Sequence, residues 1–191
     1  ILNKYPYVTY SLEGQQKEQA ENLSSLSRNY LMALLIVFML LAIPFKSYYQ
    51  PFIVMSAIPY GIIGAVFGHL LLGMDFSILS MLGIAALSGV VINDSLVMMD
   101  YINRNRIKDD NAVNAALNAG PARFRPILLT SLTTFMSVLP LIFEKSIQAK
   151  FLIPMAVSLG FGVLFSTFVT LILVPCIYVT IENIKLKLIK N

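Results

Sequence analysis

Three polar side chains interrupt one long apolar run and could carry protons or ions through a membrane. Asn93, Asp94 and Asp100 lie within residues 76–102, which are otherwise mostly apolar or small. A carboxylate near the bilayer centre costs about 3 kcal/mol or more unless it faces a protein interior, finds a partner or stays protonated. The run therefore predicts either a proton or ion relay between helices or a buried polar clamp that fixes their packing.

The spacing of these three residues separates them around a helix. At about 100° per residue, Asn93 and Asp100 lie about 20° apart on the face of Gly89, and Asp94 points about 100° away. Asp94 is then the deeper titratable group, whereas Asp100 lies near the end of the span, where it meets water, Arg104 or a neighbouring helix. We expect no second buried acid or base within the five predicted spans. The lone His69 is expected to form hydrogen bonds at the membrane interface.

A row of hydroxyl side chains follows in the next apolar run. Its members fall within about 100° of arc on one helical face and are Thr130, Thr133, Thr134 and Ser137. Hydroxyls in helices often donate to the backbone carbonyl four residues earlier, which makes such a row tolerated polarity. Alternatively the row faces Asn93 and Asp94 and lines a hydrated seam.

The composition makes lipid the solvent for most of this chain. Of 191 residues, 57% are hydrophobic and 13% are charged, against about 25% charged in soluble domains. The net charge of +4 comes from Lys and Arg between apolar runs, which argues against nucleic-acid binding. The single Cys176 excludes a disulfide framework and a cysteine-based metal site. No phosphate-binding, hydrolase or metalloprotease motif is present, so we expect neither an enzyme nor a cofactor.

The apolar runs predict an all-α, polytopic membrane bundle across residues 30–183. Its five spans are expected at residues 30–45, 51–74, 76–102, 126–143 and 151–181. Residues 1–12 resemble the last strand of an external domain, and residues 13–29 a polar helix leading into the membrane. Residues 103–124 are expected to form a loop with a short interfacial helix that ends at Gly120-Pro121, and residues 184–191 a basic tail.

The basic residues of the short loops orient the spans. Alternating the five spans puts most Lys and Arg, including Arg104, Arg106 and Lys185, on the side of the C-terminus. The positive-inside rule then predicts a cytoplasmic C-terminus and an external N-terminal end. The first residue is not Met and the span count is odd, which suggests a piece of a larger membrane protein.

Small residues recur at the spacing of close helix contacts. Gly64 and Gly68 form a GxxxG pair, and Gly89 and Gly162 lie in similar small-residue patterns in later spans. Such patterns let helix backbones approach closely in membranes. We therefore expect these four glycines at helix–helix contacts.

Four stretches, in order along the chain, resemble the resistance-nodulation-division (RND) efflux pumps. They are Ala42–Pro51 (AIPFKSYYQP), Ala57–Ala65 (AIPYGIIGA), Leu87–Tyr101 (LSGVVINDSLVMMDY) and Arg123–Ser131 (RFRPILLTS). The resemblance covers nearly the whole chain. It implies the C-terminal five of the twelve membrane helices of that family's membrane domain.

The resemblance implies a proton-driven antiporter of the bacterial inner membrane. It implies a homotrimer that works with a periplasmic adaptor protein and an outer-membrane channel, and exports small hydrophobic or amphiphilic compounds. In such pumps a lysine, an arginine and a threonine of these helices work with two aspartates elsewhere. The motifs match the threonine to Thr130 and the arginine to Arg123, but the lysine position is occupied by Asn93.

The site expected from the residues and from the resemblance together is a proton relay. Its members are Asp94, Asn93, Thr130, Arg123 and Asp100. Two other interpretations remain open at this stage. One is an RND-superfamily exporter of metal, lipid or protein. The other is a non-transporting assembly or receptor-like module in which Asp94 and Asn93 only pack helices.

Overall fold

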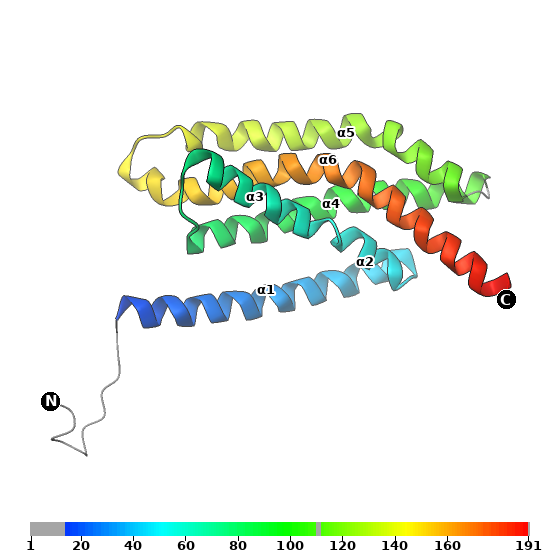
Figure 1. The fold of residues 1–191 in the computed structure, drawn as a ribbon, viewed down its shortest axis with the longest axis horizontal. Coiled ribbons are helices and arrows are strands. Elements are labelled where there is room, and N and C mark those ends of the chain that lie inside the picture. Colours follow the sequence, from blue (N-terminus) through cyan, green and yellow to red (C-terminus); the bar gives the residue numbers. More distant parts are fainter. Residues whose placement is uncertain (1–13, 110–111, 191) are drawn as a thin grey trace, which may run out of the picture. The chain divides into compact units, whose positions relative to one another are not determined.

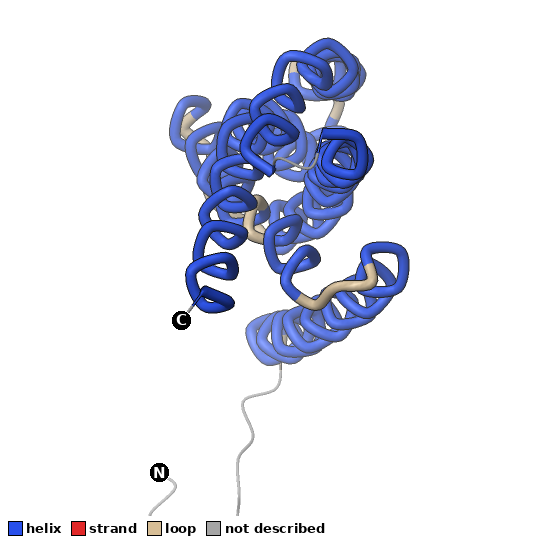
Figure 2. The backbone as a smooth tube through the Cα atoms, turned by 90° about the vertical axis from the view of Figure 1, so that its right-hand side faces the viewer, coloured by secondary structure: helices blue, strands red, loops and turns tan. Residues whose placement is uncertain are grey.

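The computed structural model describes residues 14–109 and 112–190, which form six helices and no strand (Figures 1 and 2). Five segments are long and apolar enough to cross a membrane: Lys17–Phe45, Tyr49–Leu72, Ile78–Ile107, Val113–Ile142 and Ile147–Lys185. The predicted all-α fold with five spans is therefore confirmed. The strand expected within residues 1–12 lies outside the described residues.

Helix α1 (Gln15–Phe45) crosses the boundary between two compact units, of which the first ends at Val37 and the second begins at Phe38. Its polar first part continues directly into the apolar part, because no Pro or Gly lies between Gln15 and Pro44. The helix ends at Phe45, and Lys46 follows with a φ of 48°. This left-handed conformation is the usual way to close a helix, though it is rare for a residue other than glycine.

The second predicted span, 51–74, is not one helix but two. Helix α2 (Tyr49–Met55) and helix α3 (Ile58–Leu72) are separated at Ser56-Ala57. The break has a local cause, because Pro59 has no N–H to donate to the carbonyl four residues earlier. The Gln50 and Asn103 side-chain amides donate to each other, at 3.0 and 2.8 Å, and so attach α2 to helix α4 (Ile78–Asp109).

The prediction of a loop with a short helix at residues 103–124 is wrong. Helix α4 continues to Asp109, and helix α5 (Ala112–Ile142) passes through Gly120-Pro121 without ending. Proline removes one backbone hydrogen bond, but alanine is the best helix former, and the alanines before it are packed. Ala115, Ala116 and Ala119 are at most 2% exposed.

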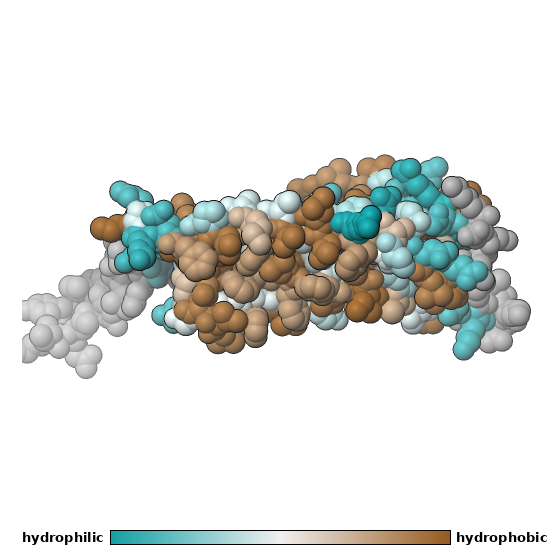
Figure 3. Space-filling view, turned by 90° about the horizontal axis from the view of Figure 1, so that it is seen from above, coloured by the Kyte–Doolittle hydropathy of each residue, from teal (hydrophilic) through white to brown (hydrophobic). Residues whose placement is uncertain are grey.

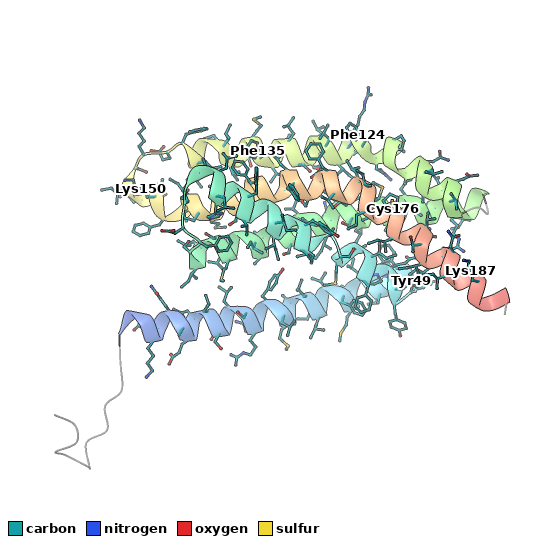
Figure 4. The ribbon with its side chains drawn as sticks, in the orientation of Figure 1. Tyr49, Phe124, Phe135, Lys150, Cys176 and Lys187 are labelled. Atoms are coloured by element: carbon teal, nitrogen blue, oxygen red, sulfur yellow. The ribbon has the colours of Figure 1, made fainter. Side chains whose placement is uncertain are left out.

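Helix α6 (Ile147–Lys190) packs against α3, α4 and α5 and is the common element of the second unit. Its 44 residues make it about 66 Å long, which exceeds the bilayer core of about 30 Å. Figure 1 shows that α6 bends in its last third. The bend lies near Cys176, labelled in Figure 4, and Pro175 inside the helix explains it. The basic tail expected from residue 184 is helical as far as Lys190.

The packed core of the second unit joins α3, α4 and α6. Its buried centre consists of Ala57, Ala65, Leu87, Val91 and Val163. Hydrophobic residues cover the middle of the face in Figure 3, and hydrophilic residues gather toward both ends. This distribution matches an apolar membrane layer with water on either side.

Three of the four predicted packing glycines lie where helices touch. A Cβ on Gly64 would overlap Phe165 and lie 2.9 Å from the Phe161 carbonyl oxygen. A Cβ on Gly68 would meet the Phe161 ring, and one on Gly162 would lie 3.0 Å from the Gly61 carbonyl oxygen. Gly89 differs, because nothing in the described chain lies within 4 Å of a Cβ there.

Candidate functional site

Asp94 lies at the midpoint of α4 and is buried, with 5% of its surface exposed. Its neighbour Asn93 is exposed, as the predicted angle of about 100° between them requires. Helix α4 runs unbroken on both sides, so the two side chains are held on different faces of a straight segment. Of the acidic side chains of this span, Asp94 is therefore the one that is buried near its midpoint, whereas Asp100 is partly exposed nearer the end.

Two hydroxyls of α5 approach the Asp94 carboxyl. Thr130 Oγ1 lies 3.5 Å from Oδ1, and Ser131 Oγ lies 3.4 Å from Oδ2. These distances are at the long limit of a hydrogen bond. Each hydroxyl also donates to the Ile127 carbonyl oxygen, at 2.8 and 2.9 Å. The carboxyl thus has polar neighbours, but each of them has a closer competing acceptor.

The rest of the hydroxyl row does not line a polar seam with Asp94. Thr133, Thr134 and Ser137 each donate to carbonyl oxygens of α5 itself, at 2.7 to 2.9 Å. Of the two interpretations left open by the sequence, tolerated polarity holds for these three residues. Thr130 fits both interpretations, because its hydroxyl lies near the Asp94 carboxyl and also donates to a carbonyl oxygen of its own helix.

Arg123 and Asp100 are not brought to the Asp94 carboxyl. The Arg123 guanidinium lies over the Tyr101 ring, 4.9 Å from its centroid. Tyr101 is seven residues beyond Asp94, about 10 Å along the helix. Asp100 pairs instead with Arg104 at 2.9 Å, and both side chains are exposed.

Two buried hydroxyls were missed by the sequence analysis. Ser131 is 0% and Thr167 2% exposed, and their hydroxyl oxygens lie 2.5 Å apart across the contact of α5 and α6. Thr167 also donates to the Val163 carbonyl oxygen at 2.8 Å. Ser131 directly follows Thr130, so its side chain points about 100° away from that of Thr130 around the helix. This angle was the signal in the sequence that could have placed Ser131 toward the core.

The prediction of no second buried acid or base is wrong. Glu182, one residue beyond the predicted last span, is 3% exposed and accepts a hydrogen bond of 2.5 Å from Arg106 of α4. Arg106 also donates to the buried Tyr178 hydroxyl at 3.2 Å. His69 is 2% exposed; its Nδ1 lies 2.9 Å from the Ala65 carbonyl oxygen and its Nε2 2.8 Å from Ser80 Oγ.

We expect the pair of Arg106 and Glu182 to stabilise the contact of α4 and α6. Side chains in one hydrogen-bond network have interaction free energies of about 0.5–3 kcal/mol. The interaction is stronger when the acid is buried, because water screens it less. A double-mutant cycle of Arg106→Met and Glu182→Gln, followed by unfolding in SDS micelles, measures the coupling. The matched control is Asp100→Asn, which breaks an exposed pair worth at most about 1 kcal/mol. Zero coupling in the cycle would contradict this expectation.

The described part of the chain contains no group of three His, Cys, Asp or Glu side chains that could hold a metal ion. The Asp94 carboxyl forms no ion pair with any described residue. Its hydrogen-bond neighbours are the Thr130 and Ser131 hydroxyls of α5. Such a carboxyl can bind and release a proton.

The model of the AcrB/AcrD/AcrF family matches residues 4–182. The swarming motility protein SwrC of Bacillus subtilis is 29% identical over 94% of this chain and 17% of its own length. The multidrug resistance protein MdtC of Proteus mirabilis is 30% identical over 81% of this chain and 15% of its own length. The chain thus spans about a sixth of the length of these relatives.

A crystal structure of a heavy metal efflux pump has the same fold. Its TM-score is 0.80 at 24% identity, and the match covers 94% of this chain and 18% of the pump. A second crystal form of a heavy metal efflux pump gives a TM-score of 0.78. Because the family model matches most of the chain, the protein belongs to the AcrB/AcrD/AcrF family, within the RND transporters.

Proposed function

We propose that this chain carries a proton-coupling site of a secondary active efflux transporter. The observation that carries the proposal is a single carboxyl, Asp94, buried at the midpoint of a membrane helix without an ionic partner among the described residues. Ionisable groups inside membrane spans are functional by default. Membership of a family of transporters supports this interpretation over a purely structural clamp.

In this proposal the protonation of Asp94 alternates during transport. A charged carboxylate in an apolar surrounding needs water or an opposite charge, and a protonated carboxyl does not. The conformation that gives Asp94 such a partner is therefore favoured when the proton leaves. A conformation that buries Asp94 is favoured when the proton returns, so proton flow shifts the conformational equilibrium.

The partner of the charged form comes, we propose, from helices of the transporter outside this chain. Asn93 and Thr130 are both exposed beside Asp94, which leaves a polar edge for another helix to cover. Asn93 has no charge and cannot form an ion pair with a carboxylate, although the resemblance places a lysine there. Asp100 of α4 and Arg123 of α5 lie nearer the proposed cytoplasmic side and have a secondary role there, in which their charges influence the water path to Asp94 without themselves being required for proton transfer.

The wider function follows from the family and stands as a proposal. The transporter lies in the bacterial inner membrane with the C-terminus cytoplasmic, as the positive-inside rule indicates. Figure 4 locates Tyr49 of α2 and Lys187 of α6 at one end of the second unit, and Lys150 at the other. The proposed assembly is a homotrimer with a periplasmic adaptor protein and an outer-membrane channel.

The proposed cargo is a hydrophobic or amphiphilic compound. The relative MdtC is named a multidrug resistance protein, while the solved pumps export heavy metals. The described residues offer no metal-binding group of three acids, histidines or cysteines, which favours the organic cargo.

The test is export by the complete transporter reconstituted in proteoliposomes with an imposed pH gradient. We expect a hydrophobic cationic dye to be moved when the gradient is present, and movement to stop when a protonophore collapses it. The same vesicles loaded with Zn²⁺ or Cu⁺ are the cargo control. Dye movement that survives the protonophore would refute proton coupling, and movement of the metal ions alone would refute the organic cargo.

A further inference from the structure

We propose that Ser131 and Thr167 are positioning residues that transmit the protonation state of Asp94 to helix α6. This inference rests on the proposed proton-coupling role of Asp94. The three side chains form a continuous polar path from α4 through α5 to α6, with steps of 3.4 and 2.5 Å. All three are at most 5% exposed, so water does not replace these contacts in the described bundle.

The path contains fewer protons than acceptors. Ser131 has one hydroxyl proton and three acceptors in reach: Asp94 Oδ2 at 3.4 Å, the Ile127 oxygen at 2.9 Å and Thr167 Oγ1 at 2.5 Å. Thr167 has one proton for the Val163 oxygen at 2.8 Å or for Ser131 Oγ. Since a hydroxyl donates once, the contacts cannot all be hydrogen bonds at the same time.

The charge on Asp94 selects which of these contacts are made. An ionised carboxylate only accepts, so the Ser131 proton turns toward Oδ2, and Thr167 turns its proton toward Ser131. Thr167 then no longer donates to the Val163 oxygen. Once Asp94 is protonated, Ser131 turns its proton to the Thr167 oxygen 2.5 Å away, and Thr167 returns its own proton to the Val163 oxygen. The hydroxyl protons only rotate; the proton that Asp94 gains or loses is exchanged with water.

Helix α6 is the element on which such a change has the widest effect. Val163, whose carbonyl oxygen gains and loses the Thr167 hydrogen bond while it keeps that from Ser166, belongs to the core shared by α3, α4 and α6. Thr130, the other hydroxyl beside Asp94, is exposed, and its hydrogen bonds go to Asp94 and to the Ile127 oxygen of its own helix. Ser131 is therefore the side chain of α5 through which the carboxyl reaches α6.

No charged side chain competes for Asp94 within the described residues. The titratable groups on the helices packed against α4 have their own partners or lie toward the helix ends. Their positions are Tyr49 on α2, Tyr60 and His69 on α3, Arg123 and Arg125 on α5, and Lys150, Cys176, Tyr178, Glu182, Lys185 and Lys187 on α6. None of them shares an ion pair or hydrogen bond with the Asp94 carboxyl.

The test compares Ser131→Ala and Thr167→Val with Ser166→Ala in the complete transporter. Valine has the shape of threonine without the hydroxyl. Ser166 is the matched control, because it is 3% exposed, neighbours Thr167 and donates to the same Val163 oxygen at 3.0 Å without contacting Ser131. Thr167→Ser restores the hydroxyl and serves as the rescue.

Two readouts separate the proposed role from a structural one. The first is the antisymmetric stretching band of the ionised Asp94 carboxylate, the form to which Ser131 donates, in infrared difference spectra, assigned by its loss in Asp94→Asn. The second is the pH dependence of export. We expect Ser131→Ala to move the band and to shift the pH midpoint of export upward by about 1 unit, the equivalent of one weak hydrogen bond lost from the carboxylate. Thr167→Val should shift both in the same direction by less, and Thr167→Ser should restore them.

The inference and the proposed function fail in different ways. If Thr167→Val behaves like Ser166→Ala in both readouts while Asp94→Asn abolishes export, the path to α6 is overturned and the coupling role of Asp94 stands. If Thr167→Val fails to fold, Thr167→Ala removes the same hydroxyl and decides the same question through the Asp94 band. If Asp94→Asn exports normally, the proposed function itself is refuted.

Discussion

Export by the complete transporter is expected to fall to background when Asp94 is replaced by Asn, and to remain largely intact in Asp100→Asn. Asparagine keeps the size of the side chain and one of its two acceptor oxygens but neither binds nor releases a proton. Asp94 is buried at the midpoint of α4, so no water-exposed acid can take its place. Asp100 is exposed and paired with Arg104, so water screens its charge and its loss has a small effect.

The measurement is dye efflux from cells that produce equal amounts of wild-type and variant transporter. Yield and thermal stability in detergent accompany it, because a purely structural Asp94 would lower both. A folded but inactive Asp94→Asn protein supports proton coupling. Loss of yield together with loss of export would instead favour the helix-packing role, and normal export would remove Asp94 from the mechanism.

Gly64→Ala is expected to destabilise the helix bundle, whereas Gly89→Ala is not. The added methyl on Gly64 would overlap the Phe165 side chain and crowd the Phe161 carbonyl oxygen, so two helix backbones must separate. Overpacking of this kind costs about 1–3 kcal/mol. At Gly89 the methyl meets nothing within 4 Å, and alanine favours the helix over glycine by about 1 kcal/mol.

Thermal unfolding of both purified variants in the same detergent tests this difference. We expect a lower melting temperature for Gly64→Ala and an unchanged or higher one for Gly89→Ala. Equal melting temperatures would mean that α3 and α6 can move apart freely at Gly64. Tight packing at Gly64 is compatible with a moving bundle and with a rigid one. Export assays of both variants therefore add information that melting temperatures do not give.

The five spans could be predicted because hydropathy alone determines them, but their helical limits could not. Residues 103–124 are polar and contain Gly120-Pro121, which normally ends a helix. Packing of the alanines before this pair compensates for the missing hydrogen bond, and packing is a property of three dimensions rather than of local sequence. The break between α2 and α3 at Ser56-Ala57, in contrast, follows from Pro59 and could have been predicted from the sequence.

The candidate site was predicted in part. Asp94 was identified because a carboxylate in an apolar run is costly wherever the run is placed. Thr130 was identified as well, and the structure brings its hydroxyl within 3.5 Å of the carboxyl. Ser131, Thr167 and Glu182 escaped notice because a serine or threonine in a membrane helix is common, and because Glu182 looked like part of a solvated end. Only the meeting of α4, α5 and α6 makes them partners.

The reciprocal amides of Gln50 and Asn103 give α2 and α4 an attachment that is insensitive to pH. Both side chains are neutral, and neither gains nor loses a proton at any pH at which a cell lives. An ionic pair in that position would weaken whenever one partner was titrated. The two hydrogen bonds, at 3.0 and 2.8 Å, stay unchanged instead, so the attachment of α2 to α4 would hold through both protonation states of Asp94 in the proposed mechanism.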